Sequence, residues 1–286
     1  MVRIDAHQHF WRYDPTEYAW ISDEMTVLKQ DFLPEHLLPL LANAGFAGSV
    51  AVQARQSLEE TKWLLELADQ YDSIRAVVGW VDLCSNQLPT QLEAFAKKTK
   101  LAGVRHVLQD EPDDEFMLRP NFRRGISRLA EFDLTYDLLI HPRHLRTAVK
   151  LVKEFPAQPF VLDHIAKPPI SKAKSSMEEI AKPELSPWRE DIQALAELPN
   201  VYCKLSGMVT EARWRKWQSE DFHPFLDIVF AAFGPERLMI GSDWPVCTLS
   251  GNYASTMQIV IDFLKQFTAE QQAAVLGANC AAFYGI

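Results

Sequence analysis

The sequence predicts a single (β/α)8 TIM barrel of the α/β class, one domain spanning residues 1–286. Eight short apolar runs alternate with longer amphipathic stretches, which is the order of parallel strands and their covering helices. Runs such as GSVAVQ and RAVVGWV are almost continuously apolar, as strands buried on both faces are. No GxGxxG motif follows the first run, which disfavours the doubly wound sheet of a dinucleotide-binding protein.

The predicted strands are rich in Val, Ile, Leu and aromatic residues. They are expected at residues 3–8, 48–54, 75–81, 102–107, 135–140, 159–163, 200–205 and 237–242. Amphipathic patterns predict helices at residues 35–44, 58–71, 88–98, 120–132, 143–154, 188–198, 222–233, 253–265 and 268–283. In the second helix, Leu64, Leu65 and Ala68 contribute to one apolar face, and Ser57 is a suitable N-cap.

Two long segments lack a regular pattern. Residues 10–33 are rich in aromatic side chains, and residues 165–187 are rich in Pro, Ser and Lys. Loops of this length in a compact domain are usually functional or mobile. Both follow the carboxyl ends of predicted strands, where the active sites of barrel enzymes lie, so we expect them to border the site.

Composition excludes several classes of protein. A net charge of −9 and a pI near 5.4 argue against a nucleic-acid partner, which would need a basic stripe. No apolar run approaches the ~20 residues of a membrane span, and MVRIDAHQHFW is too polar for a signal peptide. We therefore expect a cytoplasmic enzyme with a small-molecule substrate, no membrane contact and four free cysteines. The sequence does not predict an oligomeric state.

Polar residues gather at the predicted carboxyl ends of the strands. In chain order they are His7, His9, Gln53, Arg55, Trp80, Asp82, Arg105, His106, His141, His164, Lys204, Asp243 and Trp244. Ionisable groups at such positions are costly to bury unless they are paired or used. We expect them to converge on one mouth of the barrel.

Four of these residues could hold a metal or move a proton. His7 and His9 lie two apart on one strand, so their imidazoles point the same way and can meet one metal or one substrate. Asp243, in GSDWP, can accept a proton from water or bind a metal, and His164 can join it. The alternatives are exposed N-terminal histidines, a turn-forming aspartate and a core histidine.

The remaining strand-end residues are candidates for substrate binding. Arg105 and Arg55 offer permanently charged donors for a carbonyl oxygen or for hydroxyl groups, with surface salt bridges as the alternative. The other candidates are Gln53, Asp82, His106 and Lys204 for polar contacts, and Trp11, Trp20, Trp80 and Trp244 for stacking on a sugar ring. Asp163 points to the other face from His164 and is expected to be structural.

The motifs DAHQHFW, QAR, GWVDL, GVRH, LDHIAKP, CKLSGMVTEA and GSDWPVC together resemble the amidohydrolase superfamily. Within it they are similar to the lactonase branch, the L-fuconolactonases and related sugar-lactone hydrolases, over nearly the whole chain. The resemblance implies that His7 and His9 are the strand-one pair and that His164 is the strand-six histidine. It implies that Asp243 accepts the proton of the attacking water.

The chain departs from the metal-dependent pattern of that superfamily at two strands. Arg105 and His106 stand where those relatives carry a bridging Lys or Glu, and Arg has no free lone pair for a metal. His141 lies at or past the end of strand five, where a further metal histidine is expected. A two-metal centre is therefore not expected. Either no metal is required, or one divalent ion, zinc first, is bound by His7, His9, His164 and Asp243 or three of them.

These observations predict a hydrolase that opens the ring of a small sugar lactone. Asp243 would deprotonate water, with His9, His164 and Arg105 as further catalytic residues. Arg105, nearby histidines or a metal would stabilise the oxyanion, and a histidine or water would protonate the leaving oxygen. One alternative is a metal-dependent decarboxylase of an aromatic or related carboxylic acid. Another is a binding protein on an inactive barrel.

Overall fold

The computed structural model describes residues 2–95, 97–172 and 186–286, and part of the expected 165–187 segment lies outside them. Eight parallel strands form one sheet in the order β1 to β8. They are β1 (Ile4–Gln8), β2 (Gly48–Val52), β3 (Ile74–Gly79), β4 (Leu101–His106), β5 (Thr135–Leu138), β6 (Phe160–Leu162), β7 (Val201–Leu205) and β8 (Leu238–Ile240). A parallel bridge between Gln8 and Trp244 joins the last strand to the first, so the sheet is a barrel, as predicted.

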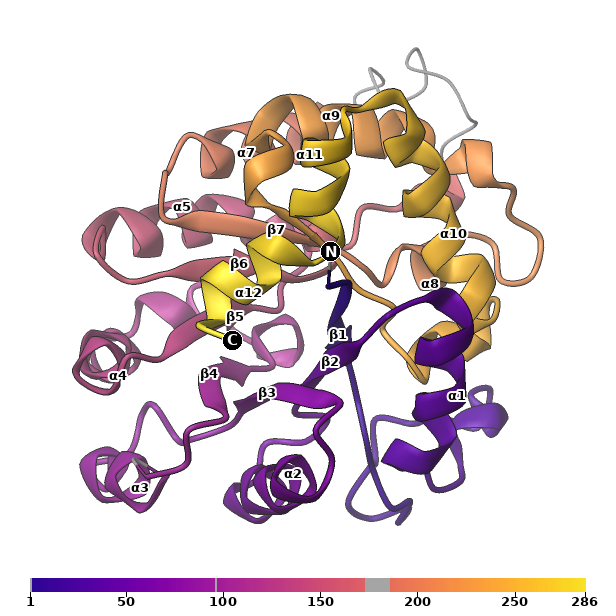
Figure 1. Ribbon diagram of the computed structural model, residues 1–286. Coiled ribbons are helices and arrows are strands. Elements are labelled where there is room, and N and C mark those ends of the chain that lie inside the picture. The colour runs from indigo at the N-terminus through magenta and orange to yellow at the C-terminus, as the bar shows by residue number, and fades with distance from the viewer. Residues whose placement is uncertain (1, 96, 173–185) are drawn as a thin grey trace.

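A ring of helices surrounds the strands (Figure 1). The helices are α1 (Pro34–Ala44), α2 (Leu58–Gln70), α3 (Leu88–Phe95), α4 (Pro120–Leu129), α5 (Leu145–Glu154), α7 (Ser186–Ala196), α8 (Met208–Glu211), α9 (His223–Phe233), α10 (Tyr253–Phe263), α11 (Ala269–Ala273) and α12 (Asn279–Tyr284). The hydroxyl of Ser57 accepts the N–H of Glu60, which confirms the expected N-cap of α2. The four-residue helix α8 was not predicted, because one turn has no detectable period.

The barrel interior has an apolar layer. A cluster of buried side chains draws Ile4, Val50 and Val161 from different strands together with Cys280 and Tyr284 of α12. Only the inside of a barrel brings these strands to one cluster, and α12 lies across their near ends in Figure 1. The polar residues described below therefore lie toward the carboxyl ends of the strands.

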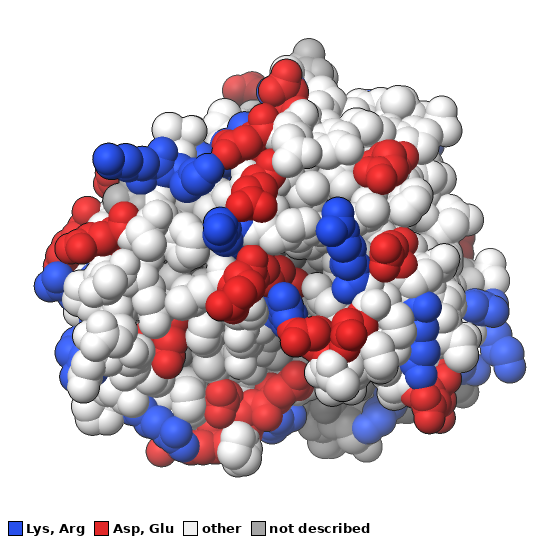
Figure 2. Space-filling view, turned by 90° about the horizontal axis from the view of Figure 1, so that it is seen from below, with Lys and Arg blue, Asp and Glu red and all other residues white. Residues whose placement is uncertain are grey.

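The charged side chains on one face of the molecule can be compared with the prediction that it has no basic stripe. On the face shown in Figure 2, acidic and basic side chains are interspersed, and no continuous basic stripe crosses that face. Among the described residues, no helix is both long and apolar enough to cross a membrane. The four cysteines are free, as expected.

Candidate active site

Side chains from the first and last strands meet in one buried cluster. His7 Nε2 lies 3.2 Å from His9 Nε2, and His9 Nε2 lies 3.3 Å from Asp243 Oδ1. Asp243 Oδ1 is also 3.8 Å from His7 Nε2 and 4.0 Å from His164 Nε2. All four residues are buried. The structure thus brings together the four residues that the sequence singled out for metal binding or proton transfer.

Closure of the barrel fixes these distances. The N–H of Asp243 donates to His7 O at 2.8 Å, and the N–H of His9 donates to Trp244 O at 2.7 Å. The carboxylate of Asp5 accepts the N–H and the hydroxyl of Ser242, at 2.8 and 2.6 Å. The segment after β8 is therefore held against β1 on both sides of Asp243.

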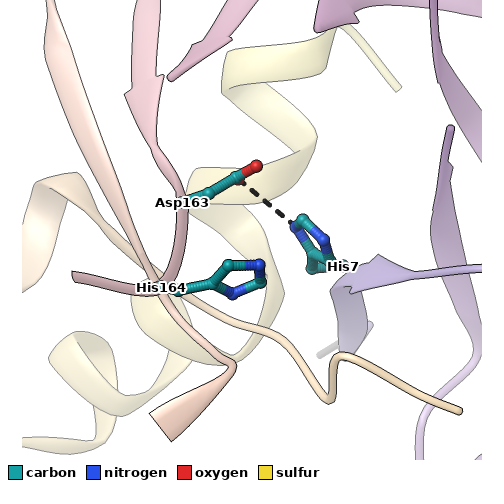
Figure 3. Close-up of side chains that lie close together, drawn as sticks. All are labelled: His7, Asp163 and His164. Atoms are coloured by element: carbon teal, nitrogen blue, oxygen red, sulfur yellow. Dashed lines mark ion pairs between the residues drawn. The ribbon is translucent and has the colours of Figure 1, made fainter. Parts of the chain in front are cut away.

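The backbone around His164 is strained. His164, Ile165, Ala166 and Lys167 all have φ between 48° and 59°, a left-handed turn that costs about 1–2 kcal/mol per residue. Gly207 (φ 62°) lies against the ring, since a Cβ there would be 2.5 Å from His164 Nδ1. Such strain clusters at functional sites. Here it turns the His164 side chain toward His7, as Figure 3 shows.

The donor atoms of His7, His9 and Asp243 fit a single divalent cation. His9 Nδ1 lies 2.8 Å from Val52 O and must donate to it, so a neutral His9 presents a lone pair on Nε2. That lone pair faces the Asp243 carboxylate, which only accepts, so a cation or a further proton is needed between them. Bonds of about 2.0–2.1 Å to a tetrahedral zinc place ligand atoms about 3.3 Å apart, which matches the shorter separations above. A second buried group, His7, Asp163 and His164, also has its ligand atoms within 4.8 Å of one another.

Arg105 is held in place beside this cluster. Its Nη1 donates to Asp163 Oδ2 at 2.9 Å and lies 3.3 Å from His7 Nε2, while Nη2 donates to Gln53 Oε1 at 3.0 Å and to Gln53 O. Its buried Nε–H has no hydrogen-bond partner within the described chain. An immobilised guanidinium at a cavity wall is suited to stabilise an oxygen atom that gains negative charge.

Burial and neighbouring charges separate the pKa values of these groups. Burial disfavours the carboxylate of Asp243, but His164, His9 and His7 outweigh it and hold its pKa below the ordinary range. Burial lowers the pKa of His164 to about 4 against the opposing pull of Asp243. Burial also lowers the pKa of His7 well below its usual value. The cluster therefore contains an ionised carboxylate beside the neutral imidazoles of His7 and His164.

A buried ionic network lies on the other side of His7. Asp163, expected to be only structural, is 3.3 Å from His7 Nδ1 and 3.1 Å from Lys204 Nζ (Figure 3 draws the first pair). Lys204 Nζ is 2.5 Å from Asp137 Oδ2, whose carboxylate also accepts the hydroxyl of Tyr284. Asp163 thus supports both His7 and the neighbouring Arg105.

Lys204 differs from the expectation that it binds substrate. Its side chain is fully buried and is held by carboxylates of the network. It is absent from the cavity lining. The structure therefore gives Lys204 a place in the network and not in the cavity lining.

A cavity of about 640 Å³ opens above the cluster, within the size range of small-molecule sites. Of the expected catalytic and substrate-binding residues, it is lined by His9, Arg55, Arg105, His164 and Asp243. Arg55 forms an ion pair with Glu17 of the β1 loop. Trp20 of the same loop also lines the cavity, so the 10–33 segment borders the site as expected.

Six expected substrate-binding residues lie outside the lining, in addition to Lys204. Gln53 is buried and holds Arg105. Asp82 accepts the N–H of Cys84 at 3.0 Å and shapes a turn. The Trp80 indole N–H lies 3.5 Å from His106 Nδ1, and His106 Nε2 in turn is 2.7 Å from a Glu111 oxygen. These four residues contact neighbouring residues, and none of them lines the cavity.

The two remaining tryptophans pack in the loop next to the cavity. The Trp11 indole donates to Leu28 O and Gln30 O, at 3.3 and 3.0 Å. The Trp244 ring packs against Phe32, with centroids 5.3 Å apart. Both are buried, so neither offers a face for stacking on a sugar.

Several lining residues were not singled out from the sequence. They are Glu17, Asp110, Glu111, Lys167, Thr210, Glu211 and Trp214. All follow strand ends, and Lys167, Thr210 and Glu211 fall within the motifs LDHIAKP and CKLSGMVTEA. Listing strand-end residues further into each loop would have found them.

Comparison with known proteins identifies the family. The chain is 40% identical to an L-fucono-1,5-lactonase of Burkholderia multivorans over 291 aligned positions, covering 100% of this chain and 96% of that protein. It is 36% identical to an L-fucono-1,5-lactonase of Burkholderia ambifaria, covering 99% and 96%. A crystal structure of a Burkholderia multivorans amidohydrolase with bound zinc superimposes with a TM-score of 0.93 at 40% identity, covering 100% of both chains. The amidohydrolase family model matches residues 4–286, and the chain belongs to that family.

Proposed function

We propose that the protein hydrolyses a small sugar lactone, L-fucono-1,5-lactone or a close relative, to the aldonic acid. The observation that carries this proposal is the ionised carboxylate of Asp243 at a cavity large enough for a monosaccharide, beside the immobilised guanidinium of Arg105. The substrate class is supported by the two L-fucono-1,5-lactonases to which the chain is similar.

In the proposed mechanism Asp243 takes a proton from a water molecule, and the resulting hydroxide attacks the lactone carbonyl carbon. The negative charge that forms on the carbonyl oxygen is stabilised by Arg105, and preorganised donors of this kind contribute about 10²–10³-fold in rate. Asp163 and Gln53 keep the guanidinium in place before the substrate arrives, so little reorganisation accompanies the reaction.

We further propose that His7, His9 and Asp243 would hold one divalent ion, zinc first, with His164 as the neighbouring fourth candidate. Supporting this assignment, His9 Nδ1 donates to Val52 O, so His9 Nε2 faces the Asp243 carboxylate at 3.3 Å, where a cation or a further proton is needed. When bound, such an ion would supply Lewis-acid stabilisation of the carbonyl oxygen. Arg105 in place of a metal ligand on β4 does not favour a second ion.

The test is a panel of L- and D-aldonolactones in a pH-indicator assay, with and without a chelator. We expect ring opening of L-fucono-1,5-lactone and a loss of about 10²–10⁴-fold in kcat in D243N, since a positioned general base contributes that much. Wild-type turnover by D243N would refute the assignment of the base. Binding of sugar acids without turnover would favour an inactive barrel, and CO2 release from an aromatic acid would favour the decarboxylase.

A further inference from the structure

Glu211 lies at the cavity in a position that the mechanism above does not use. It ends α8, the short helix after β7, and lines the same cavity as Asp243. Helix α8 packs against the turn Val246–Leu249, which follows Asp243 along the chain. Its carboxyl is half-buried and makes no hydrogen bond or ion pair within the described part of the chain.

The surroundings of Glu211 favour a protonated carboxyl group. Burial raises the pKa of Glu211 to about 7, Lys167 lowers it in part, and Asp243 raises it further. The other ionisable groups on the turns that pack against α8 are Lys172, which is exposed, and Cys247, a buried thiol with a raised pKa. One cavity therefore contains one carboxyl group that is ionised and another that keeps its proton near neutral pH.

Two of the other carboxylates of the lining, those of Glu17 and Glu111, have partners that hold them as acceptors. Glu17 is ion-paired with Arg55. Glu111 lies 2.7 Å from His106 Nε2, whose other nitrogen faces the Trp80 indole N–H, so His106 donates to Glu111. A carboxyl group without such a partner can give its proton to a substrate atom.

We propose that Glu211 is the general acid that protonates the ring oxygen of the lactone as the ring opens. Two carboxyl groups whose environments separate their proton affinities are the usual arrangement of an acid and a base in one site. The inference rests on the proposed lactonase function and assigns the group that completes it.

Asp243 gains a proton from water, and the new C–O bond gives a tetrahedral intermediate. The bond between the carbonyl carbon and the ring oxygen then breaks, its electron pair stays on the ring oxygen, and the Glu211 proton binds there. The product is a hydroxy acid, which releases its own proton to solvent. Asp243 returns its proton to solvent and Glu211 takes one up, so the enzyme is regenerated.

The experiment compares wild type, E211Q, E211D and the matched control E220Q, with the lactone that the wild type opens fastest, between pH 5.5 and 9. Glu220 lies on the same connection after β7, is exposed and is absent from the cavity lining. We expect wild-type kcat/KM to fall above about pH 7, since Glu211 loses its proton there. We expect E211Q to lower kcat about 10²-fold or more, with KM little changed, and to abolish the alkaline fall.

E211D should recover part of the rate together with the alkaline fall, and E220Q should match wild type. A ring-sulfur analogue of the lactone adds a second measurement, because a thiol of pKa about 8.5 leaves without help from an acid. The E211Q loss should shrink to less than about 10-fold with that analogue. Melting temperatures of all variants establish that they are folded.

Three results would overturn the proposal: an E211Q profile like that of E220Q, a change confined to KM, or an equal loss with the oxygen and sulfur lactones. A change confined to KM would make Glu211 a binding residue. If the wild type opened no lactone in the panel, the proposed function itself would fall. Lactone opening with an unchanged E211Q would overturn the acid assignment alone.

Discussion

Replacing Lys204 with Met should destabilise the barrel far more than replacing an exposed lysine. The Lys204 ammonium is fully buried, 2.5 Å from Asp137 and 3.1 Å from Asp163, and its cation also lies 5.5 Å from the ring centroid of Tyr284. Met keeps most of the side-chain volume but leaves the buried Asp137 carboxylate without its counter-charge, and it leaves Asp163 with Arg105 as its remaining cation. The perturbation is therefore electrostatic and leaves packing almost unchanged.

The magnitude follows from the burial of all three charged groups. Removing one partner of a buried ion pair costs about 3–5 kcal/mol, because the charge that stays behind is not solvated. An exposed pair is worth about 0–1 kcal/mol. The matched control is K265M, since Lys265 is 71% exposed and pairs with Asp262 at 2.6 Å. At about 2 °C per kcal/mol for a chain of this length, K204M should melt about 6–10 °C below wild type.

Denaturant unfolding at pH 8 and pH 5.5 measures both the loss and its origin. Burial raises the pKa of Asp137 to about 6, a value that Lys204 holds down. At pH 5.5 a larger fraction of Asp137 is protonated than at pH 8, so removing the Lys204 charge costs less free energy of unfolding at pH 5.5. The K204M loss should therefore be larger at pH 8. A loss below about 1 kcal/mol, equal to that of K265M, or independent of pH would refute the reasoning.

Three further predictions concern the site and its supports. G207A should cut activity and stability because its Cβ would meet the His164 ring at 2.5 Å, whereas G285A, also at positive φ but with nothing within 4 Å, should cost only about 1 kcal/mol in denaturant unfolding; equal effects would contradict this. Burial raises the pKa of Glu60 to about 7, so its contribution to stability falls as pH rises from about 4.5 through 7. The melting temperature of E60Q relative to wild type should therefore be higher at pH 8 than at pH 5, and a constant difference would contradict the shift. H9A should bind zinc at least about 10-fold more weakly in a competition titration with a chromophoric chelator, and unchanged affinity would remove His9 from the ligand set.

The sequence predicted the barrel and the central cluster well because both depend on local order along the chain. His7 lies near the end of β1 and His9 follows two residues later, and Asp243 follows an apolar run. Their places at strand ends were enough to predict that they lie close together. The strand bounds in the structure differ from the predicted ones by at most a few residues, mainly where β5 and β8 end early. Asp243 itself has φ 56°, which no strand residue adopts.

The sequence did not distinguish strand-end residues that line the cavity from those that are buried beneath it. Lys204 lies at a strand end like Arg105, but it points to the buried carboxylates, and only three-dimensional register distinguishes the two. The sequence made Trp11 a candidate for stacking on a sugar. The carbonyl groups that accept its indole N–H, those of Leu28 and Gln30, lie far along the loop, so no local pattern showed that the side chain packs there. Glu211 lies on a single helical turn that carries no periodic signal.

The segment after β8 pairs with β1, and this pairing can form only after nearly the whole chain has been synthesised. His7 and His9 leave the ribosome early in synthesis, whereas Asp243 emerges near the end, and two backbone hydrogen bonds must form before the three can meet. A nascent chain that lacks the eighth strand therefore carries the histidines but neither the carboxylate nor the walls that orient it. The cluster is therefore complete only after the segment that follows β8 has paired with β1, and a chain that ends before Asp243 lacks the proposed base.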